Sequence, residues 1–229
     1  MSGARSERAV VLGAGLMGRL LACELAAAGH DVDVYEAGTA EAPGSAAHVA
    51  AAMLAPLAES AVTELGVVRM GSHALLRWPE LIAQLGRPVF FQQQGTLVLW
   101  HRQDAAEATR FQQLLAATAR DMPQLPGLEV LDGAGVARIE PSISERFAQG
   151  LYLRGEGQLD NRELLSALLQ RLDELGVRVQ WSSPRSPADF DESLGGWLFD
   201  CRGLGARSDW SSLRGVRGEV VRLHAPEVT

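Results

Sequence analysis

The chain has 229 residues, of which 47% are hydrophobic, 6% aromatic and 21% charged, and its formal net charge is −7. These values are typical of a folded α/β protein with one substantial core and room for a smaller second lobe, and they exclude a disordered chain. The negative charge, with no local cluster of Lys or Arg, excludes general nucleic-acid binding.

Several simple patterns narrow the class of protein further. No apolar stretch reaches the length of a membrane span, because Glu, Arg, His or Gly interrupts each run that is rich in Ala and Leu. Residues 1–8 lack the apolar core of a signal peptide, so we expect a cytoplasmic protein. Cys23 and Cys201 have no metal-spaced partners and the His residues are scattered, so we expect reduced thiols and no metal site.

Residues 9–36 have the pattern of a βαβ unit. The apolar run at residues 9–12 predicts a buried parallel strand, and a helix is expected from about Leu16 to Gly29. A second strand follows, in which Val32 and Val34 alternate toward the interior.

The turn of this unit carries the spacing of a dinucleotide-binding motif. Gly13 permits the tight turn, Gly15 lets a pyrophosphate approach the backbone, and Gly18 lets the helix pack against the strand. The helix N-terminus then presents unpaired N–H groups to the phosphates, and Glu36 can accept hydrogen bonds from both ribose hydroxyls. The expected cofactor contacts in this region are Gly13, Gly15, Leu16, Met17, Gly18, Glu36 and Ala37.

The nature of the cofactor depends on the segment after Glu36. An acidic residue at the end of the second strand argues against NADP but fits NAD or FAD equally well. Residues 37–56 form a small-residue segment that is poor in polar groups and starts with Gly and Pro, so it can lie against a flat ligand. The alternative interpretation is an Ala-rich buried helix that ends at Pro56.

Together these segments resemble the D-amino-acid oxidase superfamily, most closely its glycine oxidase branch. The resemblance is carried by the dinucleotide motif and by residues 45–47, 51–56, 155–161, 200–206 and 217–219. It implies a Rossmann-like FAD-binding domain of glutathione-reductase type with an inserted α+β substrate domain. The implied FAD contacts in the small-residue segment are Ser45, Ala46 and Ala47 near the phosphates, and Ala51, Ala52, Met53 and Leu54 along the isoalloxazine ring.

Two positions of this segment depart from the family pattern. Ala52 stands where the family usually has Gly before Met-Leu, and His48 stands where small residues are more usual. The additional methyl group of Ala52 is expected to shift flavin or substrate slightly.

The middle of the chain fits a substrate lobe. Residues 59–85 have helical spacing, with a break expected at Pro79. Residues 89–92 and 96–100 flank a turn at 93–95 and predict a packed hairpin, although its aromatic and Gln side chains could also line a pocket. A further helix is expected over residues 103–120.

The chain then returns to the cofactor domain. Asn161 is expected to cap a helix that ends at Gly176. Strands are predicted at residues 177–181 and 196–200, the second of which leads to a glycine turn in which Asp200 stabilises the backbone. From the resemblance, the FAD contacts of this turn are Cys201, Arg202 and Gly203. The expected domain ranges are 1–85 and 155–216 for FAD binding, 86–154 for the substrate domain, and 217–229 for the start of a second substrate segment.

A strand-like run at residues 220–223 stands close to the end of the chain. Members of the resembled family continue well beyond this point, and the continuation holds the Arg and Tyr that contact the substrate. We therefore expect a fragment or a natural truncation, and we assign no catalytic residue.

The function that the resemblance implies is oxidation of a small amino acid or amine, such as glycine, sarcosine or a D-amino acid. The products would be an imine or 2-oxo acid and H₂O₂, with O₂ as the electron acceptor, and the branch suggests a role in thiamine biosynthesis. The small substrate and O₂ are the expected partners, and a homo-oligomer is compatible with the sequence. Two alternatives remain: an NAD-linked dehydrogenase and a non-catalytic FAD-binding fragment.

Overall fold

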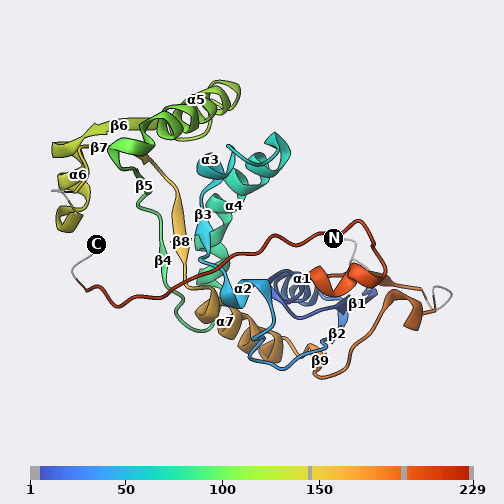
Figure 1. The fold of residues 1–229 in the computed structure, drawn as a ribbon. Helices are drawn as coiled ribbons and strands as arrows, with labels where there is room; N and C mark the ends of the chain where they lie inside the picture. The colour runs from blue at the N-terminus through green and yellow to red at the C-terminus, as the bar shows by residue number, and fades with distance from the viewer. Residues whose placement is uncertain (1–5, 144–145, 192–194, 227–229) are drawn as a thin grey trace. The chain divides into compact units, whose positions relative to one another are not determined.

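A computed structural model describes residues 6–143, 146–191 and 195–226. Most of the N-terminal segment used above to predict a cytoplasmic protein, residues 1–5, lies outside the described residues. The chain forms two compact units, coloured along the sequence in Figure 1. The first unit comprises Met1–Ala52, Gln84–Val89 and Asp160–Val220, and the second comprises Met53–Ala83, Phe90–Leu159 and Val221–Thr229.

A four-stranded parallel sheet forms the centre of the first unit. Its strand order is β10-β1-β2-β9, with β1 at Arg8–Leu12, β2 at Asp31–Tyr35, β9 at Arg178–Gln180 and β10 at Trp197–Asp200. Residues 9–12 are buried, as expected for an apolar run inside a parallel sheet. The predicted α/β fold class with a Rossmann-like parallel sheet is confirmed.

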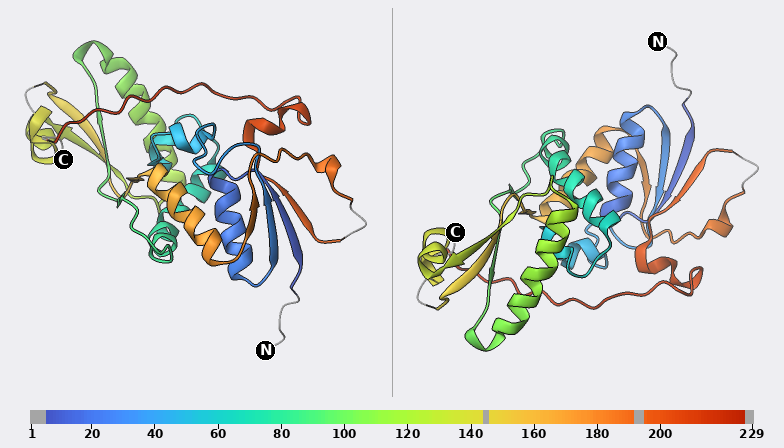
Figure 2. Two further views of the ribbon diagram at one scale, coloured as in Figure 1. Left: turned by 90° about the horizontal axis from the view of Figure 1, so that it is seen from below. Right: turned by 90° about the horizontal axis from the view of Figure 1, so that it is seen from above.

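Two helices of the first unit, α1 (Leu16–Ala27) and α7 (Asn161–Glu174), lie side by side in both views of Figure 2. The apolar face of α7 is buried through its repeated Leu residues, and Gly176 ends the helix with a φ of +70°. The predicted cap at Asn161 is wrong, because the side chain of Asp160 accepts the amides of Arg162 and Glu163 at 2.8 and 2.9 Å. Asn161 is instead the first helical residue, and its side chain is buried.

The second unit contains two antiparallel sheets. The first has the strand order β3-β8-β4, with β3 at Met53–Leu54, β8 at Gly157–Leu159 and β4 at Phe91–Gln92. The second has the strand order β5-β7-β6, with β5 at Thr96–Leu99, β7 at Gln149–Leu153 and β6 at Leu128–Asp132.

The predicted hairpin of residues 89–92 and 96–100 is wrong. β4 pairs with β8 and β5 pairs with β7, so the two strands belong to different sheets. Gln92 lies opposite Gln158 and Thr96 lies opposite Leu153, so the register continues in one direction across residues 93–95. Gln93, Gln94 and Gly95 therefore form an irregular connection between the strand pair β4–β8 and the strand pair β5–β7, and the chain does not reverse its direction there.

The helices of the second unit are α3 (Pro56–Glu59), α4 (Leu65–Ala83), α5 (Ala105–Asp121) and α6 (Gly133–Ile139). Its core contains Leu57, Val68, Leu115, Met122, Leu125, Leu151 and Leu153. The break predicted at Pro79 is wrong, because α4 is continuous through it. Leu75 and Trp78 are buried on the turn before Pro79, and their packing outweighs the hydrogen bond that Pro cannot donate.

The remaining elements are short. A four-residue helix, α2 (Ala46–Val49), contacts α7, and 3₁₀ helices lie at Arg102–Asp104, Pro141–Ile143, Pro187–Asp189 and Gly203–Ser208. Residues 220–223, expected as a strand, form none, since no neighbouring strand pairs with them in the part of the chain that is described.

The two compact units divide the chain differently from the predicted domain ranges. Residues 53–83 and 155–159 group with the second unit, because β3 pairs with β8 and because α3 and α4 contribute to the core of that unit. Within the described residues, no helix is long and apolar enough to cross a membrane.

Candidate cofactor site

The glycine-rich turn after β1 has two positions where a side chain cannot be accommodated. Gly13 has a φ of +94°, and a Cβ atom there would lie 2.7 Å from the carbonyl oxygen of Cys201. A Cβ atom on Gly18 would lie only 1.8 Å from the carbonyl oxygen of Gly13, so the helix packs tightly on its own preceding loop. By contrast, a Cβ atom on Gly15 would have no neighbour closer than Ser45 Cβ at 3.8 Å, which leaves the backbone of Gly15 accessible to a ligand.

The N-terminus of α1 follows this turn directly. Gly15 is the cap residue and provides no side-chain acceptor, so the first amides of the helix, at Leu16, Met17 and Gly18, have no intrahelical partner. Met17 is exposed. Free amides and the helix dipole at the carboxyl edge of a parallel sheet are the features that bind a phosphate group, so this turn fits the diphosphate of FAD.

Glu36 lies beside the glycine-rich turn at the end of β2. Its carboxylate accepts the backbone amide of Ala14 at 2.6 Å through Oε2 and that of Gly38 at 2.7 Å through Oε1. Each carboxylate oxygen can accept a further hydrogen bond, so Glu36 has acceptor capacity for the hydroxyl groups of a ribose. Ala37 is the residue between Glu36 and Gly38, which are joined by this hydrogen bond.

Arg19, which the sequence analysis did not single out, is also part of this region. It is 1% exposed and donates at 2.7 Å to the carbonyl oxygens of Ala14, Leu165 and Ala40. A cation on the first turn of a helix that also carries the acidic residue Glu24 is a common pattern, and it does not by itself single out Arg19.

The small-residue segment is not a buried helix, so that alternative interpretation is wrong. The helical part is α2 alone, none of its residues is buried, and Ser45 caps it by accepting the amide of His48 at 3.2 Å. Pro56 begins α3 instead of ending a helix, since Pro is favoured at the first helical position. Asn161 holds the segment by donating to the carbonyl oxygens of Ala47 and, at 2.7 Å, Ala50.

Ala52 has the left-handed backbone conformation that favours Gly, with a φ of +58°. The preceding Ala51 is exposed, Met53 is 51% exposed, and Leu54 is half-buried. The backbone at Ala52 thus retains the geometry of a glycine position, although the residue itself carries a methyl group.

The turn after β10 lies at the same edge of the sheet as the glycine-rich turn. The amide of Cys201 donates to the carbonyl oxygen of Leu12 at 2.7 Å, and burial raises the pKa of the Cys201 thiol. Arg202 donates to Asp200 at 2.6 Å and to Asp209 at 2.7 Å, and its hydrogen bonds lower the pKa of Asp200 despite partial burial. Asp200 therefore stabilises the turn that leads to Gly203.

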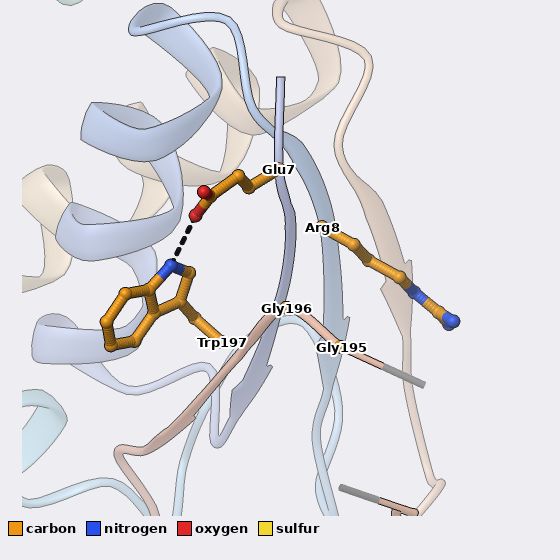
Figure 3. A pocket seen from close by; sticks show the side chains of 5 residues that line it. All are labelled: Glu7, Arg8, Gly195, Gly196 and Trp197. Atoms are coloured by element: carbon orange, nitrogen blue, oxygen red, sulfur yellow. Dashed lines mark hydrogen bonds between the residues drawn. The ribbon is translucent and has the colours of Figure 1, made fainter. Parts of the chain in front are cut away.

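A separate pocket of about 410 Å³ lies at the other end of the strands. It is lined by Glu7, Arg8, Gly195, Gly196 and Trp197, and Figure 3 shows the side chains of Glu7 and Trp197 pointing toward each other. Because ligands of open parallel sheets bind at the carboxyl ends of the strands, this pocket at the amino ends is not the cofactor site.

A parallel sheet with a sterically required glycine turn, a free helix N-terminus and an acidic residue after the second strand defines a dinucleotide-binding fold. The chain belongs to the DAO family of FAD dependent oxidoreductases, whose family model matches residues 8–228. FAD is the cofactor of this family. The predicted cofactor is thereby confirmed, and the NAD-linked alternative is set aside.

One relative in sequence and two solved structures illustrate what the chain is similar to. The chain is 32% identical over 224 residues to a Rhizobium etli protein named as a thiamine biosynthesis oxidoreductase, ThiO, and the match covers 97% of this chain and 62% of that protein. The fold is similar to that of glycine oxidase from Geobacillus kaustophilus, with a TM-score of 0.64, 23% identity and coverage of 77% of this chain and 47% of that one. Iminodiacetate oxidase from Chelativorans sp. BNC1 has a TM-score of 0.67, 19% identity and coverage of 87% and 56%. The chain thus spans about half to three-fifths of the length of these proteins.

Proposed function

We propose that this chain supplies the FAD-binding part of an oxidoreductase that acts on the amino group of a small amino acid or amine. The observation that carries the proposal is the corner formed by Gly13, Gly15 and Glu36. There, a required glycine turn, a free helix N-terminus and a carboxylate meet at the carboxyl edge of the sheet.

The substrate class is supported by the relatives. The names of two of the similar solved structures give glycine and iminodiacetate as substrates, and both compounds are small and carry an amino group. The Rhizobium etli relative is named as an oxidoreductase of thiamine biosynthesis. FAD, when bound by these residues, would supply the two-electron oxidant for this reaction. The substrate would lose the hydrogen of the carbon next to the amine and a proton of the amino group to give an imine. Water would then hydrolyse the imine to a 2-oxo acid and release ammonia or an amine, while O₂ would take up the two electrons and two protons as H₂O₂.

The chain's own residues bind and orient the cofactor in this proposal. The residues proposed to contact FAD are Gly13, Gly15, Leu16, Met17, Gly18, Glu36, Ala37, Ser45, Ala46, Ala47, Ala51, Ala52, Met53, Leu54, Cys201, Arg202 and Gly203. Among them, Arg202 is already paired with two carboxylates, so we expect it to shape its turn more than to bind the cofactor directly.

The test begins with the bound cofactor. The purified chain, loaded with FAD where necessary, is heated, and the released compound is expected to run as FAD on chromatography. A peroxide assay with glycine, sarcosine and D-alanine then tests the reaction. FAD binding without any peroxide would favour the alternative of a non-catalytic FAD-binding chain, and no FAD binding at all would contradict the proposal.

A further inference from the structure

Arg19 is a buried cation, and its side-chain hydrogen bonds with described residues all go to backbone carbonyl groups. Its side chain donates through Nε to Ala14, through Nη1 to Leu165 and through Nη2 to Ala40, each at 2.7 Å. The guanidinium also lies 5.5 Å from the ring centre of Trp181. These contacts join the glycine-rich turn, the loop after β2, helix α7 and the end of β9.

No carboxylate forms an ion pair with Arg19 among the described residues. Burial lowers the pKa of Arg19, while the more distant charges of Glu36 and Glu41 partly offset the effect. Placing a cation in the interior without an adjacent anion is costly. An apolar side chain would avoid the cost of the charge, although it would remove the donor that three carbonyl oxygens share. A function that uses the positive charge of Arg19 would explain why the fold tolerates the cost of burying it.

The neighbours of Arg19 indicate where the charge acts. The peptide groups on either side of Ala14 are fixed from opposite directions, because Glu36 accepts the amide of Ala14 and Arg19 donates to its carbonyl oxygen. Arg19 also belongs to the first turn of α1, whose free amides form the phosphate-binding end of the helix. Its charge thus lies beneath the turn that is shaped to receive a diphosphate.

We propose that Arg19 is a positioning residue of the cofactor site: it fixes the glycine-rich turn through Ala14 and provides the buried positive charge that attracts the diphosphate of the dinucleotide. This inference rests on the proposed FAD binding. It adds a residue that lies outside the glycine motif and that acts on the anionic part of the cofactor without touching it.

The competing explanation is that Arg19 only ties α1 to α7 and to the loop at Ala40. A purely structural tie would affect every ligand of the site equally. A charge effect would grow with the negative charge of the ligand, so adenosine, AMP and ADP form the series that separates the two explanations.

The experiment is titration calorimetry of adenosine, AMP, ADP and FAD with the wild-type chain, Arg19→Met, Arg19→Gln and Arg19→Lys. For both neutral variants we expect about tenfold weaker binding of ADP and FAD, a smaller loss for AMP and little change for adenosine. Arg19→Lys keeps the charge, so its ratio of ADP to adenosine affinity should stay within about threefold of the wild-type ratio. Arg19→Gln retains a donor for one carbonyl and serves as the neutral variant if Arg19→Met does not fold.

Arg178→Met is the matched control. It removes the same charge from the same unit, but the hydrogen bonds of Arg178 go to Asp31 and Asp33, and none to the glycine-rich turn is found among the described residues. We expect the ligand series to be unchanged in this variant. Equal losses for adenosine and ADP in the Arg19 variants, or no loss for either, would overturn the inference. A wild-type chain that binds ADP but not FAD would contradict the proposed function alone, because the ADP arm still decides the role of Arg19.

Discussion

The carboxylate of Glu36 accepts the backbone amide of Ala14 at 2.6 Å, so the end of β2 is joined directly to the turn that follows β1. The same carboxylate accepts the amide of Gly38 at 2.7 Å. The proposed ribose acceptor is therefore already oriented by the backbone before a ligand arrives, which lowers the conformational cost of binding.

Replacement of Glu36 tests this relationship. Glu36→Ala should weaken FAD binding by about 1.5–3 kcal/mol, the usual contribution of hydrogen bonds to a charged group. Equilibrium dialysis against FAD measures the change, with Glu24→Ala on the exposed face of α1 as the control that should have no effect. Unchanged FAD affinity in Glu36→Ala would show that other groups hold the ribose.

The strained backbone at Ala52 gives a prediction for stability. Ala52→Gly should raise the free energy of unfolding by about 1 kcal/mol, because Gly adopts a φ of +58° without the steric penalty of a Cβ atom. The neighbouring Ala51, which lacks a positive φ, is the control, and Ala51→Gly should lower stability. Urea unfolding measures both variants. A loss of stability in Ala52→Gly would mean that contacts of the methyl group outweigh the strain.

Glu156 is a buried carboxyl group whose ionisation opposes folding. Its Oε1 accepts the amides of Leu57 and Ala58 at 3.0 and 2.8 Å, whereas Oε2 is buried without a hydrogen-bond partner in the described part of the chain. Burial raises the pKa of Glu156, although the two amides and the Thr96 hydroxyl act against this rise. For an acid with a raised pKa, the stabilising contribution is complete below the unfolded-state pKa and is lost as pH rises through the folded-state pKa.

Two substitutions separate the hydrogen bonds of Glu156 from its charge. Glu156→Gln keeps an acceptor for the two amides, so the fall in stability between mildly acidic and neutral pH should be smaller than in the wild type. Glu156→Ala leaves both amides unpaired and should cost about 1–3 kcal/mol in acid. This cost should shrink toward neutral pH, where ionisation of Glu156 weakens the wild type. Urea unfolding across this pH range measures the difference, and identical pH profiles for the wild type and Glu156→Gln would contradict the assignment.

Asp33 has the opposite dependence on pH. It is buried in β2, and burial acts to raise its pKa, but hydrogen bonds and charges from Arg178 and Arg8 outweigh burial and lower the pKa. Its contribution to stability should be present above the unfolded-state pKa of about 4 and be lost as pH falls through the lower folded-state value.

Asp33→Asn tests this contribution. The variant should be less stable than the wild type by about 1–3 kcal/mol at neutral pH, because Asn cannot accept charge-assisted bonds from both Arg residues. The difference should shrink in acid, where the wild-type carboxylate is protonated. A difference that is constant with pH would show that the Asp33 charge does not stabilise the fold.

The parts of the fold that were predicted correctly depend on local chemistry. Gly13 follows strand β1, and one helix and one further strand separate it from Glu36, so the spacing of apolar residues around them determines where both residues must lie. The end of α7 at Gly176 could be read in the same way, from a glycine that follows a repeated Leu pattern.

The features that were missed depend on distant partners. The separation of β4 and β5 into two sheets is caused by β8 and β7, which occur more than fifty residues later and which no turn signal at residues 93–95 can reveal. Burial of Arg19 depends on carbonyl groups of Ala40 and Leu165, so an isolated Arg on a helix gives no indication of it. Continuity of α4 through Pro79 is likewise decided by packing and not by propensity.

The close approach of Gly13 to Cys201 has a consequence for biosynthesis. The glycine-rich turn lies within the first twenty residues of the chain. Strand β10, which pairs with β1 and leads to the Cys201 backbone beside Gly13, is available only when residues 197–200 have been translated. Until then, the side of β1 that later pairs with β10 is an uncovered edge. Pairing of Ala9 with Trp197 joins residues that are very distant in the sequence, which is a slow kind of contact to form. On the ribosome, the nascent protein should therefore become able to retain FAD only after β10 has been made, long after its most recognisable motif has left the exit tunnel.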